Sequence, residues 1–262
     1  MSQLIIYFSI HPESYPEPLL DDRFQNNFRN CNSFIMENTE QWHTKCCDLE
    51  SQYNRLSNGG AIDEIIPCEG KDSIEHQLPP SEFEKVLRGK IHCSERTVIL
   101  ERSPVPYLET KNFHTDLKNT LEQTGLDGAV KLCETQLQEL AANMNQRDKA
   151  LLDLICKQLK GNAKVFVFRG AAHERYLSKL LNEKKILFTP VRFCQPTLEE
   201  RVLFPLTMEE QLDETDVLKW LYVQVTRHNG DFEKLRTLME KADAMDKKQL
   251  RFELTALSKG DL

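Results

Sequence analysis

Residues 164–181, KVFVFRGAAHERYLSKLL, decide the fold class of this chain. An apolar run, VFVF, stops at Arg169 and Gly170, and a segment with regularly spaced leucines follows. The run is typical of a strand buried on both faces, and the leucine spacing is typical of an amphipathic helix. The stretch therefore predicts a strand, a tight turn and a helix, with His173 where the helix begins.

The rest of the first 196 residues repeats this alternation of strands and helices. Short runs rich in β-branched or aromatic residues predict further strands, at 4–10, 33–36, 97–100 and 185–193, the last interrupted or edged by Pro190. The segments between them have helical patterns, at 20–30, 39–57, 79–89 and roughly 127–160. Such alternation predicts an α/β fold with a mainly parallel sheet flanked by helices.

The character of the sequence changes near residue 196. Residues 197–262 contain no convincing strand and predict two to four helices, with breaks at Pro205 and near Asn229-Gly230. We therefore expect an α/β core domain over 1–196 and a helical C-terminal region over 197–262 that packs on it.

Composition excludes several classes of protein. The net charge of −7 argues against nucleic-acid binding, which normally needs a basic face. No apolar run approaches the roughly 18 residues that span a bilayer, and the N-terminus lacks the basic region of a signal peptide. None of the eight cysteines forms a CxxC motif or a zinc-type spacing with histidine. These features predict reduced thiols and a cytoplasmic location.

Polar residues follow the predicted strands where each one ends. His11, Glu37 and Glu101 come directly after the first three strands, and His173 follows the strand at 164–168. If the strands are parallel, these residues lie along one edge of the sheet, where sites in open parallel sheets form. The alternative is that strands simply end in something polar.

Each of these residues has a functional and a structural interpretation. His11 precedes Pro12, which keeps it extended, and its ring points into a cleft or lies in a surface turn. Glu37 suits a metal ligand or general base, or is an acid favoured at a helix start. Glu101 is a site carboxylate or an ion-pair partner of a nearby arginine. The start of a helix favours a neutral imidazole at His173, suited to a ligand or base, although a capping or packed histidine is the alternative.

Arg147 and Asp148 interrupt the apolar stripe of the long predicted helix. A half-buried Arg–Asp pair is costly unless it is partnered, so Arg147 is a candidate clamp for an anionic intermediate or for a carboxylate. The alternative is that the helix bends outward at this point.

Taken together, these motifs resemble the TraB/ChaN/TIKI superfamily, which includes erythromycin-esterase-like proteins. The family pattern has two Gly-x-x-His motifs, a strand that ends in glutamate and an arginine on a helix. Here IIYFSIH brings His11, SFIMENTE brings Glu37, NQRDKALLDLICKQL brings Arg147 and KVFVFRGAAHERYLSKLL brings Gly170 and His173. The chain departs from the pattern at two positions: Phe8 replaces the first glycine, and Asp148 replaces the asparagine usual beside the arginine.

The resemblance implies a hydrolase of peptidase or esterase type that acts on a small molecule or a peptide. It implies a catalytic set of His11, Glu37, Arg147 and His173, to which Glu101 is added by position alone. It also implies a divalent metal ion, held by His11, Glu37 and His173, or a water positioned by them.

Two other interpretations remain open. The chain is also consistent with a catalytically inactive binding or regulatory protein, which docks a protein partner through its C-terminal helices. Candidate anchors for that docking, with core packing as the alternative, are Trp220, Leu221, Phe232 and Leu238. A third interpretation is a secreted effector with an export signal inside the chain or at its C-terminus.

Overall fold

The computed structural model describes residues 2–9, 21–36, 97–100, 113–161, 163–193, 197–226 and 232–259. The chain divides into two compact units: unit 1 holds residues 1–107 and 146–195, and unit 2 holds residues 108–145 and 196–262. One boundary between the units lies between residues 195 and 196, close to the boundary that the sequence predicted. Residues 108–145, which were expected in the first domain, group instead with the C-terminal helices. One cause is apolar packing, since the ring of Phe113 lies 5.5 Å from that of Trp220.

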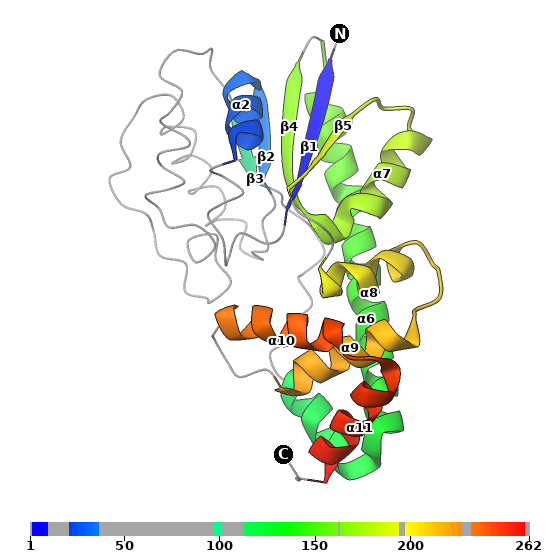
Figure 1. Cartoon of the computed structure of the whole chain (residues 1–262). Helices are drawn as coiled ribbons and strands as arrows, with labels where there is room; N and C mark the ends of the chain where they lie inside the picture. Colours follow the sequence, from blue (N-terminus) through cyan, green and yellow to red (C-terminus); the bar gives the residue numbers. More distant parts are fainter. Residues whose placement is uncertain are drawn as a thin grey trace, which may run out of the picture. The chain divides into compact units, whose positions relative to one another are not determined.

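Unit 1 is built on a five-stranded parallel sheet (Figure 1). Its strands are β1 (Gln3–Ser9), β2 (Ser33–Met36), β3 (Thr97–Leu100), β4 (Lys164–Gly170) and β5 (Thr189–Arg192), in the order β3-β2-β4-β1-β5. This confirms the predicted α/β fold with a parallel sheet. The fifth strand is shorter than predicted, and among the described strands it pairs with β1 alone. Pro190 therefore lies on an edge strand of this sheet, where a missing N–H is tolerated.

One face of the sheet is an aromatic layer covered by α2 (Asp22–Asn30). Phe24 and Phe28 of this helix are fully buried, and Phe24 meets the rings of Tyr7, Phe166 and Phe168 at 5.3 to 5.5 Å. The helix begins at Asp21, whose carboxylate accepts hydrogen bonds from the backbone N–H groups of the first turn. Burial of these rings is the main apolar contribution on this face.

The opposite face carries the residues that alternate with the aromatic ones. Phe8 of β1 pairs in register with Arg169 of β4 and with Arg192 of β5, so these three residues form one row across the sheet. Arg169 hydrogen-bonds Asp148 of α6 (Phe113–Gln158), which places residues from that helix on this face. The row lies at the carboxyl ends of the strands.

Helix α6 is longer than predicted, because it begins at Phe113 rather than near residue 127. Leu117 and Leu121 extend its buried stripe by two turns, and both are almost completely buried. The helix contains one kink, at Gly125, whose φ of 76° is a left-handed value that favours glycine. Cys133 is buried, and the same burial raises the pKa of its thiol.

After β4 the chain turns through a 3-10 helix, η1 (Ala171–His173), into α7 (Glu174–Glu183). The predicted strand–turn–helix is therefore present, with His173 as the last residue of η1 and the residue that precedes α7. Leu177, Leu180 and Leu181 are buried, as their spacing predicted.

Unit 2 combines the first part of α6 with four further helices. They are α8 (Leu198–Thr207), α9 (Glu214–Thr226), α10 (Phe232–Ala244) and α11 (Lys247–Ser258). The predicted break at Pro205 is wrong: α8 continues to Thr207 with the proline in its last turns. The predicted break near Asn229-Gly230 falls outside the described residues.

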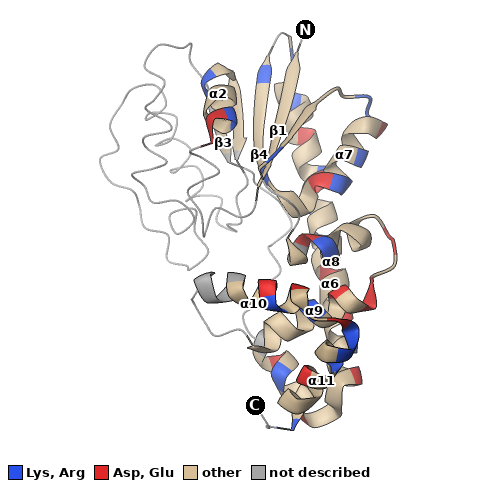
Figure 2. Cartoon of the chain, viewed as in Figure 1, with Lys and Arg blue, Asp and Glu red and all other residues tan. Residues whose placement is uncertain are grey.

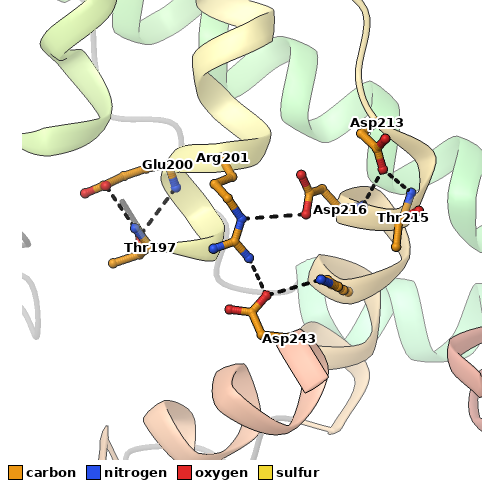
Figure 3. A network of polar contacts seen from close by, with 8 residues as sticks. Thr197, Glu200, Arg201, Asp213, Thr215, Asp216 and Asp243 are labelled. Atoms are coloured by element: carbon orange, nitrogen blue, oxygen red, sulfur yellow. Dashed lines mark hydrogen bonds and ion pairs between the residues drawn. The ribbon is translucent and has the colours of Figure 1, made fainter. Parts of the chain in front are cut away.

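Charged side chains connect three of these helices (Figure 3). Arg201 of α8 pairs with Asp243 of α10 and lies 3.6 Å from Asp216 of α9, and Lys219 lies 3.5 Å from the same Asp243. The cluster is partly exposed, so each of its ion pairs contributes little to stability. Trp220 and Leu221 are buried in α9, so they are core residues and not exposed docking anchors.

No helix among the described residues combines the length and the apolar character needed to cross a membrane.

Candidate active site

The carboxyl ends of four strands lie along one edge of the sheet, as the sequence predicted. In the parallel register, Met36 pairs with Leu100 and with Phe168, and Ser9 pairs with Gly170. The candidate residues His11, Glu37 and Glu101 follow these strand ends closely, but all three lie outside the described residues.

At this edge the structure brings together an arginine, an aspartate and a histidine. Nη2 of Arg169 donates to Oδ1 of Asp148 at 2.9 Å, and Nδ1 of His173 lies 2.9 Å from the same oxygen. Nη2 of Arg169 also lies 3.2 Å from Nδ1 of His173. Arg169 and Asp148 are completely buried and His173 is 3% exposed, so the triangle is removed from solvent.

The local sequence explains why the three groups meet. Arg169 alternates with Phe168 in β4 and therefore points away from the aromatic face, toward the residues of α6. His173 comes four residues later, after Gly170 and one turn of 3-10 helix. β1 carries no charged residue, and the charged residues of β4 are Lys164 and Arg169, near its two ends (Figure 2).

Arg147 is the other site residue that the structure describes. It is 3% exposed and precedes the fully buried Asp148, so the interpretation in which α6 bends outward here is wrong. The apolar stripe of α6 is thus interrupted by an inward-facing pair of charges. A buried guanidinium is suited to bind a carboxylate or another anionic group.

Phe8 separates this cluster from a second ion pair. The phenyl ring is fully buried, with Arg169 and Arg192 as its neighbours in register on either side. Arg192 forms an ion pair with Glu174, the residue after His173. The residue that stands where the resemblance expects glycine therefore lies on the same face as the cluster.

The second oxygen of Asp148 has a different environment. Among the described residues, Oδ2 is buried and has no hydrogen-bond partner, and the same holds for Oγ of Ser9 at the end of β1. Burial of polar atoms without partners is costly, so such atoms are expected where water or a ligand binds. Both lie at the edge where the strands end.

A metal ion needs more ligands than the described part of the chain supplies. No group of three His, Cys, Asp or Glu side chains that could hold an ion gathers among the described residues. Nδ1 of His173 lies against the carboxylate of Asp148, and a metal-binding imidazole commonly donates its other ring N–H to such a group. The other two predicted ligands, His11 and Glu37, lie outside the described residues, so the metal stays a prediction.

The sequence interpretation missed two members of the triangle. Asp148 was considered only as the neighbour of Arg147, and Arg169 only as part of a turn. Two signals could have identified them: an arginine that ends a run of apolar strand residues, and its spacing of four from His173. A charge in such a position needs a buried partner.

Comparison of the chain with protein-family models, with curated proteins and with solved structures found no match.

Proposed function

We propose that this chain is a hydrolase of peptidase or esterase type in which His173 is the reacting side chain. The observation that carries the proposal is a buried histidine, held against an arginine–aspartate pair, at the carboxyl edge of a parallel sheet. Sites of open α/β sheets form at this edge, and buried ionisable clusters concentrate at functional sites. The resemblance to the TraB/ChaN/TIKI superfamily adds the reaction class.

In this proposal the imidazole of His173 activates water toward a carbonyl group. Arg147 stabilises the negative charge that develops on the carbonyl oxygen. Glu37 is a metal ligand or the general base. His11 and Glu101, which follow other strands of the sheet in the sequence, are the remaining members of the proposed catalytic set. A divalent ion bound by His11, Glu37 and His173 would lower the pKa of its bound water and polarise the substrate. A cytoplasmic location is part of the same proposal.

The test is hydrolysis by the purified full chain. Substrates are p-nitrophenyl esters from acetate to octanoate and a panel of fluorogenic peptides, each with and without EDTA and added Mn²⁺ or Zn²⁺. We expect turnover in the wild type and a loss of at least about 100-fold in His173→Gln, the lower end of what one acid–base group contributes. His114→Gln, on α6 in unit 2, is the control and keeps full activity. Equal turnover in His173→Gln and the wild type contradicts the proposal.

One observation favours a second candidate, a binding protein without catalytic activity. Phe8 fills the position between Arg169 and Arg192 with a fully buried ring, where the resemblance expects a glycine. If this candidate is right, no substrate in the panel is hydrolysed by the folded wild type, with or without metal. Turnover that depends on His173 rules it out.

A further inference from the structure

β5 is an edge strand whose sequence is suited to pairing with another strand. Among the described strands it pairs with β1 alone, and its other edge faces away from the sheet (Figure 1). The segment that contains it, ILFTPV at 186–191, is rich in β-branched and aromatic residues, and Leu187 within it is 87% exposed. Exposed apolar edge strands are the usual places where copies of one chain pair with each other. The groups along the outer edge of β5 decide whether such pairing occurs.

The register of the sheet shows which backbone groups lie on that outer edge. The N–H of Phe193 donates to the carbonyl of Phe8 at 3.0 Å, and Phe8 is the register partner of Arg192. In a parallel pair, both backbone groups of one residue point to the same side of the strand, and the side alternates from residue to residue. The backbone groups of Thr189 therefore face β1, whereas those of Pro190 and Arg192 face outward.

Pro190 closes the middle of the outer edge. Its ring fills the place of an N–H, so this outward position has no hydrogen to donate to another strand. Two copies of β5 that paired about a two-fold axis at the centre of the strand would place residue 190 of each copy opposite the other. Residues opposite each other at such a position exchange two N–H···O bonds, and both would be missing.

Arg23 covers the outward position that follows. Its Nη1 donates to the carbonyl oxygen of Arg192 at 3.4 Å. Asp21 holds the guanidinium in place, because its Oδ2 accepts from Nη2 at 2.6 Å and its Oδ1 accepts from Nε at 3.0 Å. A second strand that approached this position would have to displace a charged side chain that also contacts water, since Arg23 is 54% exposed.

We propose that Pro190 and Arg23 form an edge guard, a pair of residues that keeps β5 from pairing with a second copy of this chain. Pro190 contributes the larger part, because it removes a donor and fills the space of that donor. Arg23 contributes one long hydrogen bond and a charge. The edge guard is independent of the proposed function, because it acts on the association of the chain and neither residue belongs to the proposed catalytic set.

The test is the self-association of the full chain, measured by sedimentation velocity over a series of protein concentrations. Pro190→Val restores the outward N–H, and its matched control is Thr189→Val, which adds the same side chain where the N–H faces β1. We expect Pro190→Val to associate about tenfold more tightly than the wild type, because a symmetric pair regains two hydrogen bonds. Thr189→Val should associate no more tightly than the wild type.

Hydrogen exchange locates the contact, and a second variant isolates Arg23. In the Pro190→Val assembly, the amides of residues 188–192 should gain protection that disappears when dilution restores the monomer. Arg23→Gln alone should associate like the wild type, because Pro190 still closes the edge. Combined with Pro190→Val, it should strengthen association further.

Each outcome supports or overturns a defined part of the proposal. Pro190→Val that associates no more tightly than the wild type overturns it. Thr189→Val that associates as tightly as Pro190→Val also overturns it, because apolar surface and not the donor would then be the cause. New protection outside 188–192 has the same consequence. If Arg23→Gln adds nothing to Pro190→Val, only the role of Arg23 is overturned.

The folding of each variant is checked by circular dichroism. Pro190→Thr is the second variant at the decisive position, because it restores the same N–H with a polar side chain. If Pro190→Val does not fold, association of Pro190→Thr beyond that of the wild type supports the edge guard, and unchanged association overturns it.

Discussion

The Arg169–Asp148 pair offers a sharp test of what the buried cluster contributes to stability. Both side chains are completely buried and share a 2.9 Å charge-assisted hydrogen bond. Replacement of either residue alone removes the charge with which the other one pairs, which costs about 3–5 kcal/mol. Because 1.4 kcal/mol is a factor of about ten, a loss of 3 kcal/mol raises the unfolding equilibrium constant by about 150-fold.

The double variant should behave differently. Asp148→Leu with Arg169→Met removes both charges and keeps the apolar volume, and such replacements are often neutral or stabilising. The ring of His173 loses its contacts with both side chains at the same time, which costs about 1–3 kcal/mol. We therefore expect the double variant to lie closer to the wild type than either single variant does, with a coupling energy of at least about 2 kcal/mol.

The assay is urea unfolding followed by far-UV circular dichroism, with hydrogen exchange of peptides covering β4 as the probe specific to unit 1. The control cycle uses Arg192 and Glu174, whose side chains are 25% and 24% exposed, and should give a coupling energy below about 1 kcal/mol. If the effects of Asp148→Leu and Arg169→Met add to within about 0.5 kcal/mol, the two charges are not coupled and the reasoning is refuted.

Three further predictions concern the scaffold. Phe24→Ala should destabilise unit 1 by about 3–5 kcal/mol, because the ring meets five other aromatic rings. The protection of the β4 amides against hydrogen exchange should fall by the same amount. Unchanged protection would contradict the stabilising role of the aromatic layer. Gly125→Ala should cost about 1–3 kcal/mol in urea unfolding, because its φ of 76° and ψ of −171° are essentially restricted to glycine. Nothing lies within 4 Å of the added methyl group, so a clash does not contribute. A neutral result would mean that the kink relaxes. Asp213→Ala should cost about 1 kcal/mol at pH 7, because Oδ1 accepts from the N–H groups of Thr215 and Asp216 at the start of α9. These bonds lower the pKa of Asp213, so its contribution is present above about pH 4 and fades as pH falls through the lower folded-state value. Asp213→Ala and the wild type should then converge in thermal unfolding below that pH, and a constant difference between them would contradict the assignment.

The elements around His173 show how much of the site local sequence patterns could predict. A run of apolar residues, a glycine and a leucine repeat predicted both β4 and α7, because these signals act over a few residues. The parallel arrangement placed four strand ends at one edge, which is where the sequence put its candidate residues. The start of α6 was placed near residue 127 instead of at Phe113, and the structure shows that the helix continues across a kink at Gly125, a residue with positive φ.

The tertiary structure alone decided which charges meet. Arg169 and Asp148 are 21 positions apart in the chain, on a strand and a helix, and no periodicity relates residues on different elements. The order β3-β2-β4-β1-β5 likewise depends on how helices cross the sheet, so only the fold made Phe8 a neighbour of both Arg169 and Arg192. The sequence by itself determined the kinds of element and the position of His173, because local backbone preferences and side-chain periodicity are encoded residue by residue. The burial of Arg169 and its pairing with Asp148 follow from packing, because a charge can leave water only where the assembled sheet and helix supply its partner.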